Sequence, residues 1–214
     1  MPALPKPSGD FEQAPEGTQL AVCVGVVDLG TQPNMYQGQV NGEAHKVLVF
    51  WETTAEVTSR GDRFQVMREY TWSMGDKSNL RKDLQSWRGK AFTEADFDGP
   101  TAFDIKNIIG KPCQVVIGRT SGDKAKVTAV AGWPKGIPAP TPSVTSFFVW
   151  LSKEDYAEEH FDALPDFWKD KIKASPEWKA LHAPTPRANG GMSQVAIDKA
   201  ERGDDSDMSD EIPF

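Results

Sequence analysis

Aromatic and basic side chains gather in one part of this sequence, between residues 64 and 90. The segment 64–74, FQVMREYTWSM, alternates as a β-strand does, which puts Arg68, Tyr70 and Trp72 on one face. The densest basic stretch follows it and comprises Lys77, Arg81, Lys82, Arg88 and Lys90, with Trp87 among them. Aromatic rings stack on bases of any sequence, and Lys and Arg neutralise phosphates. These residue types therefore indicate a surface for a single nucleic-acid strand.

Two aromatic residues outside this stretch extend the candidate surface, namely Tyr36 in the first long loop and Trp51 in the second apolar run. The stacking candidates are Tyr36, Trp51, Tyr70, Trp72 and Trp87. The candidates for phosphate contacts are Arg68, Lys77, Arg81, Lys82 and Arg88. A second interpretation stays open, because an aromatic residue can equally belong to the core. A helix face rich in Lys and Arg can likewise serve solvation alone.

The elements that must position these residues are mostly strands. Runs typical of β-strands cover 19–29, 44–53, 64–74, 113–119 and 124–132, with a turn-rich loop predicted over 30–42. The helical spacing of Leu80, Leu84 and Trp87 predicts a helix over 78–87, with Ser78 as its N-cap. A short helical turn is predicted over 103–109.

The predicted order, β-β-β-α-β-β, is that of the OB-fold. This fold is a five-stranded Greek-key barrel, here with a helix inserted after the third strand, and it commonly binds oligonucleotides around strands 2 and 3. The protein is thus predicted to be mainly β. A generic small barrel or an α+β domain stays open as an alternative, and the fold alone would not define a function.

The composition divides the chain into five parts. We expect a flexible lead at 1–18, the OB-fold domain at 19–133, a Pro-rich linker at 134–146, a helical appendage at 147–182 and a disordered tail at 183–214. Within the appendage, the apolar run 147–151, FFVWL, is expected to pack back on the domain. Helical pieces are predicted at 153–161, 165–174 and 176–182, two of them opening with Pro.

Charge and cysteine usage narrow the class of protein. The net charge is −7, but residues 1–150 carry 16 basic and 16 acidic side chains, and five acids lie in 204–214. An acidic total therefore does not exclude a nucleic-acid partner. Cys23 and Cys113 each lie in an apolar run and are expected to be buried free thiols in a reducing compartment, with a disulfide as the alternative.

The sequence points away from membranes, metals and catalysis. It contains no run of 18 apolar residues and no secretory leader pattern, so a cytoplasmic location is expected. There is no CxxC and the histidines are scattered, so neither a metal nor a cofactor is expected. The segment 74–78, MGDKS, lacks the spacing of a P-loop, and neither GxSxG nor HExxH occurs. A protein that is not an enzyme is the expectation.

The last eleven residues, 204–214, read DDSDMSDEIPF and place five acids before three apolar residues. The ending DEIPF resembles the C-terminal tip of bacterial single-stranded DNA-binding proteins. That resemblance implies that the tip docks on replication and repair enzymes through Asp210, Glu211, Ile212, Pro213 and Phe214. In this interpretation Phe214 fills an apolar pocket, its carboxylate meets an Arg, and the acids face a basic rim.

Three further segments resemble phage and prophage OB-fold proteins described as single-stranded DNA-binding: 23–30 (CVGVVDLG), 84–89 (LQSWRG) and 175–178 (SPEW). The resemblance implies a phage-type protein of DNA replication or recombination, acting in the cytoplasm of a bacterial host. Single-stranded DNA and host or phage replication and repair proteins are the expected partners, and a homo-oligomer stays open.

Two other functions stay open as alternatives. An adaptor or decoy would capture the host enzymes without touching DNA, and a recombination accessory would anneal complementary strands. The acidic tail could also regulate DNA binding by competing with phosphates for a basic groove.

Overall fold

The structure, a computed structural model, describes residues 12–183 except 37 and 101. The chain divides after His182 into two units, and the first unit is the one described below. Residues 184–214 of the predicted tail at 183–214 and most of the predicted lead at 1–18 lie outside the described residues. Among the described residues, no helix is long and apolar enough to cross a membrane.

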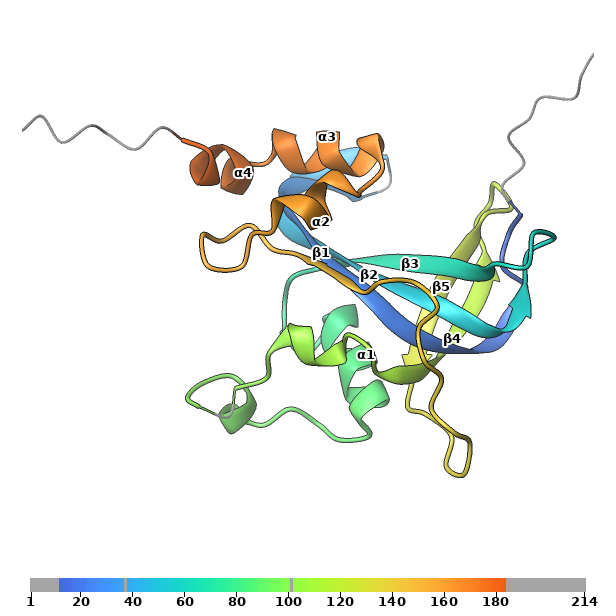
Figure 1. Cartoon of the computed structure of the whole chain (residues 1–214). Helices are drawn as coiled ribbons and strands as arrows, with labels where there is room; N and C mark the ends of the chain where they lie inside the picture. The colour runs from blue at the N-terminus through green and yellow to red at the C-terminus, as the bar shows by residue number, and fades with distance from the viewer. Residues whose placement is uncertain (1–11, 37, 101, 184–214) are drawn as a thin grey trace, which may run out of the picture. The chain divides into compact units, whose positions relative to one another are not determined.

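A twisted six-stranded sheet dominates the first unit (Figure 1). Its strands are β1 (Gly17–Tyr36), β2 (Gln39–Val57), β3 (Arg63–Thr71), β4 (Pro112–Arg119), β5 (Ala125–Ala131) and β6 (Phe147–Val149). The first five are antiparallel neighbours in the order β3-β2-β1-β4-β5, and β6 runs parallel to the middle of β1. The expectation of a mainly β protein is thereby confirmed.

The sheet does not close into a complete barrel in the described part of the chain. The helix α1 (Asn79–Arg88) follows β3 as expected, and the 3-10 turns η1 (Glu94–Asp96) and η2 (Ile105–Ile108) precede β4. In the described part of the chain, no ladder of backbone hydrogen bonds joins the edge strands β3 and β5. The side chain of Arg68 spans the seam, because its Nη1 donates to the carbonyl oxygen of Thr128 at 2.6 Å.

The prediction of a loop over 30–42 was wrong. β1 and β2 continue through this region as one long hairpin, with Tyr36 paired to Gln39. Most of its turn-type residues lie at or beside register shifts, of which one falls between Asp28 and Gly30. A bulge accepts such residues without ending the strand. Gly30 has a φ of 66°, and a side chain there would also meet Ser175 at 2.6 Å.

The long hairpin carries an apolar cluster on each face. The inner cluster includes Cys23, Val26 and Trp51 and is capped by Leu80 and Leu84 of α1. The outer cluster comprises Val22, Val24, Val27, Leu29, Leu48 and Phe50 together with appendage residues. A register shift between Cys23 and Gly25 explains how both Cys23 and Val26 face inward, because one extra residue reverses the alternation.

Cys23 and Cys113 are buried free thiols, as expected. Burial raises the pKa of Cys23 to about 12. Burial likewise raises the pKa of Cys113 well above its ordinary value. Neither thiol is therefore a nucleophile near neutral pH.

The appendage covers the outer cluster. It comprises β6 and the short helices α2 (Glu158–Asp162), α3 (Asp166–Ala174) and α4 (Pro176–Leu181), which lie over one end of the hairpin (Figure 1). Phe161, Leu164 and Ile172 bury their side chains there. The expectation that 147–151 packs back on the domain is confirmed by β6. Gly25 makes this possible, since the ring of Phe147 occupies the place of any Cβ at that position.

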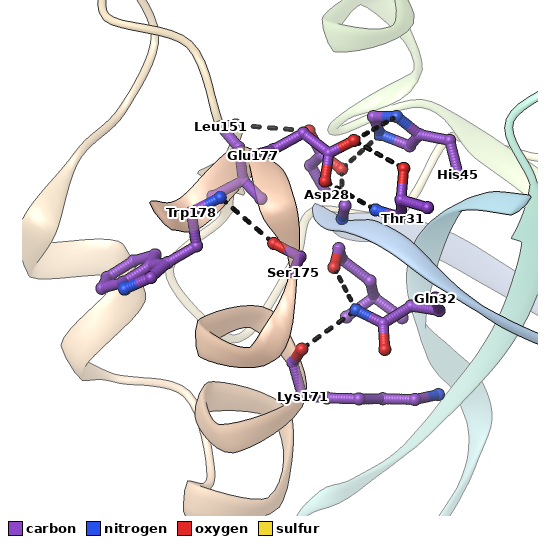
Figure 2. Close-up of polar contacts among 11 residues, drawn as sticks. Asp28, Thr31, Gln32, His45, Leu151, Lys171, Ser175, Glu177 and Trp178 are labelled. Atoms are coloured by element: carbon purple, nitrogen blue, oxygen red, sulfur yellow. Dashed lines mark hydrogen bonds and ion pairs between the residues drawn. The ribbon is translucent and has the colours of Figure 1, made fainter. Parts of the chain in front are cut away.

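Polar contacts also hold the appendage to the hairpin (Figure 2). Thr31 donates to the carboxylate of Glu177 twice, from its backbone N at 2.8 Å and from its hydroxyl at 2.6 Å. Gln32 Nε2 donates to the carbonyl oxygen of Lys171 at 2.9 Å. These bonds pair part-buried polar groups of the hairpin with groups of the appendage.

The Pro-rich linker lies over the outer face of β2. The side chain of Glu52 lies on this outer face, and the linker covers it, so that it is only 1% exposed. Ser143 of the linker donates to its carboxylate from both its backbone N and its hydroxyl. Arg63, which contacts Glu52, also donates to the carbonyl oxygen of Thr141. The linker and the appendage thus cover much of the strand 2 surface on which nucleic acid was expected.

Candidate nucleic-acid interface

The structure turns the predicted aromatic face of β3 toward the core. Trp51 is 1% exposed and Tyr70 is 4% exposed. The hydroxyl of Tyr70 donates to Oδ2 of Asp83 at 2.7 Å, inside this packed layer. Neither ring offers a face to a base, so the stacking predictions for Trp51 and Tyr70 were wrong. The alternation of side chains along β3 was predicted correctly. The aromatic face was expected to point to solvent, however, and it points into the core.

Trp87 also serves the packing of the core. Its ring lies against Trp51 with 6.3 Å between centroids, and its Nε1 donates to the carbonyl oxygen of Pro112 at 2.9 Å. The side chain of Tyr36 lies outside the described residues, as do the tip residues Asp210, Glu211, Ile212, Pro213 and Phe214.

Two of the predicted phosphate contacts are structural ion pairs instead. Arg68 Nη1 lies 2.8 Å from Oδ2 of Asp83, and both side chains are 15% exposed. Because Arg68 also ties β3 to β5, its guanidinium group is occupied within the fold. Its assignment to phosphate is therefore corrected.

Arg88 is occupied in the same way. Its Nη2 lies 2.5 Å from Oδ1 of Asp96, and its guanidinium lies 4.1 Å from the centroid of Phe92 and 4.9 Å from that of Phe103. Hydrogen bonds from the backbone of Thr93, and then from Arg88, hold the pKa of Asp96 well below its usual range. Arg88 therefore organises the loop after α1 and is not available to a phosphate.

The remaining predicted residues are accessible. Trp72 is 37% exposed, and Lys77 and Lys82 are exposed. Arg81 is half-buried, and its Nη1 lies 2.9 Å from Oδ1 of Asp76.

Trp72 is part of a row of aromatic rings that its sequence neighbours do not reveal. The ring of Trp150 meets Trp72 edge to face at a centroid distance of 5.0 Å. Phe148 stacks on Trp150 at 5.7 Å with an interplanar angle of 4°. We call Trp72, Trp150 and Phe148 the aromatic strip. All three side chains remain accessible to solvent, since Trp72 is exposed and Phe148 and Trp150 are only half-buried.

The strip is held by the sheet on both sides. The backbone N of Trp72 donates to the carbonyl oxygen of His45 at 2.7 Å, which extends the β2–β3 pairing beyond β3. Phe148 belongs to β6, where it is paired with Val26 of β1. Sequence reasoning missed Phe148 and Trp150, although their spacing of two residues in an apolar run was a signal that they share one face.

Cationic groups flank the aromatic strip. Lys106 Nζ lies 4.7 Å from the centroid of Phe148 and is ion-paired with Asp155. The imidazole of His45 stacks on Trp150 at 6.5 Å. A hydrogen bond with Asp28 is the main reason that the pKa of His45 is raised, which favours its charged form. The rings are suited to stack on bases, whereas both cations are already paired with carboxylates within the fold.

An open cleft of about 600 Å³ is lined by the two residues that flank Trp72 in the chain, Thr71 and Ser73, among others. Its lining includes Lys46 of β2, Thr71 of β3 and Lys77 of the loop before α1. A second hollow of about 380 Å³ begins on the other side of Lys46 and Glu69 and reaches Lys171 of α3. We call the first of these the Lys46–Lys77 cleft.

The beginning of α1 lines the same cleft. Ser78 precedes the helix, but its hydroxyl donates to the carbonyl oxygen of Ser73 at 2.5 Å and does not cap the helix. The first turn of α1 contains no acidic residue. The partial positive charge of this helix end is thus not offset by a carboxylate in its own first turn.

No model of a protein family matches this chain, and no curated protein matches it in a sequence search.

Proposed function

We propose that this chain is a sequence-nonspecific single-stranded DNA-binding protein built on an OB-fold. The strand order β3-β2-β1-β4-β5, with α1 after β3, supports the OB-fold assignment. In that assignment the seam between β3 and β5 is where the barrel would close, and Arg68 spans it. The proposed function is binding and protection of DNA strands in replication or recombination.

The observation that carries this proposal is the aromatic strip. Single-stranded DNA exposes its bases, and base–aromatic stacking contributes about 1–3 kcal/mol per base without regard to sequence. Trp72, Trp150 and Phe148 supply adjoining rings on the surface, with Lys106 at one end. The proposed binding surface therefore lies on the strip and not on the outer face of β2, which the linker and appendage cover.

Recruitment of replication or repair enzymes is the second part of the proposal. It rests on the sequence of 210–214, DEIPF, whose acids and apolar residues suit a basic-rimmed apolar pocket on a partner. Removing Phe214 is expected to abolish co-purification of such enzymes while DNA binding remains. Loss of both activities together would contradict a separate recruiting role.

Binding to a labelled dT oligomer of about 16 nucleotides, followed by anisotropy at low salt, tests the DNA-binding proposal. Trp72→Ala and Trp150→Ala are each expected to weaken binding about tenfold or more, as stacking energies of this size imply. Phe167→Ala is the matched control, because Phe167 is an aromatic residue that is 67% exposed and outside the strip.

Three outcomes separate the candidate functions. A folded wild-type protein that does not bind the oligomer at low salt would eliminate the proposal and leave the adaptor or decoy function. Equal losses for Phe167→Ala and Trp72→Ala would remove the strip from the proposed site. Faster annealing of complementary strands in the presence of the protein would add the recombination accessory role.

A further inference from the structure

We propose that the Lys46–Lys77 cleft binds backbone phosphates of the same DNA strand whose bases stack on the aromatic strip. This inference rests on the proposed function and adds the path of the strand. On this path the strand leaves Trp72 and passes along the loop before α1, between Lys46 and Lys77.

The charges in the cleft support an anionic ligand. Its two acidic residues are already paired, Glu69 with Lys171 at 2.7 Å and Asp76 with Arg81 at 2.9 Å. Lys46 and Lys77 also line the cleft, and neither forms an ion pair with any residue that the structure describes. Two uncompensated positive charges thus face the same open space.

Lys46 is held in position for such a contact by neutral groups. Its Nζ donates to Oδ1 of Asn34 at 3.0 Å and to Oγ1 of Thr71 at 2.9 Å. A lysine ammonium has three N–H donors, so one remains for a phosphate oxygen. Because the side chain is already ordered by these bonds, binding a phosphate costs less conformational entropy than ordering a free lysine.

The position of Lys46 connects the cleft to the strip. Thr71, which accepts a bond from Lys46, immediately precedes Trp72 in the chain. The cleft and the first stacking ring are thus adjacent along the chain, at the end of β3. The lining of the cleft also fits a sugar–phosphate backbone, because it presents hydroxyl and amide groups from Ser73, Ser78 and Asn79.

The cleft differs from the apolar hollow on the far side of α1. That hollow has a volume of about 250 Å³ and is lined by Leu84, Trp87, Phe103 and Ile108 together with Arg88, Asn107 and Lys111. The surface that it exposes is almost entirely apolar, which suits a phosphate less well than the polar surface of the Lys46–Lys77 cleft. We therefore assign the phosphates to the Lys46–Lys77 cleft.

The salt dependence of DNA binding tests the inference in the full-length protein. Affinity for a labelled dT oligomer is measured at several salt concentrations from about 50 to 300 mM for the wild type, Lys46→Gln, Lys77→Gln and the double variant. Each phosphate contact on a single strand contributes about 0.7 to the slope of log affinity against log salt concentration. Each single variant should therefore lower the slope by about 0.7 and weaken binding several-fold at the lowest salt.

Lys135→Gln is the matched control, because Lys135 is exposed in the linker and outside the cleft. Lys77 is exposed, so its variant keeps the test independent of the bonds that Lys46 makes within the fold. Lys77→Arg, which keeps the charge, should retain the wild-type slope.

The outcomes distinguish this inference from the proposed function. If the wild type binds and Trp72→Ala weakens binding, but Lys46→Gln and Lys77→Gln keep the wild-type slope, the cleft is not a phosphate site and the strip remains. If Lys135→Gln lowers the slope as much as Lys77→Gln, the effect is general charge and the inference is wrong. If the wild type does not bind single-stranded DNA, both proposals are wrong.

Discussion

His45 Nε2 lies 2.6 Å from Oδ1 of the buried Asp28, joining the two strands of the long hairpin where the appendage packs against them (Figure 2). The same carboxylate accepts bonds from the backbone N of Gly30 at 2.8 Å and of Leu151 at 3.3 Å. Glu177 of α4 approaches the other imidazole nitrogen of His45 at 3.7 Å. One cluster therefore links β1, β2 and the appendage.

This cluster predicts a pH dependence of stability. The hydrogen bond with Asp28, followed by the charges of Asp28 and Glu177, raises the pKa of His45 above 6.5 despite partial burial. A raised folded-state pKa gives a contribution that is complete below pH 6.5 and is lost as the pH rises through the folded-state value.

We expect the free energy of unfolding, measured by urea denaturation, to lose this contribution on the alkaline side of pH 6.5. His45→Gln should remove that part of the pH dependence. His182→Gln is the control, because His182 is exposed and stacks only within the appendage. A His45→Gln profile parallel to the wild type would contradict the assignment.

Gly25→Ala should destabilise the docking of the appendage. The new methyl group would occupy the same space as the ring of Phe147, so β6 must shift away from β1. Overpacking of this kind costs about 1–3 kcal/mol. Thermal unfolding should show the loss, and proteolysis should cut more readily within 134–182. Gly122→Ala is the control, because the nearest atom to its new methyl group is 3.9 Å away; equal losses in the two variants would rule out this explanation.

Tyr70→Phe separates the core function of β3 from DNA binding. The change removes the hydroxyl that donates to Asp83 at 2.7 Å, while Arg68 still pairs with that carboxylate. We expect a loss of about 1 kcal/mol in the free energy of unfolding. Affinity for a dT oligomer should stay at the wild-type value. A loss of affinity as large as that of Trp72→Ala, without loss of stability, would return Tyr70 to the binding surface.

Deleting 204–214 should tighten DNA binding at low salt. The segment carries five acids, which compete with DNA phosphates for the same lysines when they are tethered to the protein. The difference from the full-length protein should shrink as salt increases, because screening weakens both interactions. Stopped-flow association and equilibrium anisotropy would measure it. Equal affinities at every salt concentration would count against a regulatory tail.

The sequence by itself located most elements of this protein, because each was signalled by local chemistry. Alternating apolar residues marked the strands, Leu80 and Leu84 marked α1, and the apolar composition of 147–151 required burial. The free buried thiols Cys23 and Cys113 also followed from their neighbours in the chain. Signals of this kind need no knowledge of distant residues.

The tertiary structure decided which of these surfaces remain available. Alternation along β3 defines two faces, but only packing against α1 and β5 determined that Tyr70 turns inward. Arg68 was predicted to contact phosphate, but it pairs with Asp83, which is 15 residues away in the chain. The ring of Trp72 lies against the ring of Trp150. The parallel pairing of β6 with β1 is what brings Trp150 to this surface. Contacts between residues far apart in the chain depend on how the layers pack, and local periodicity does not encode them.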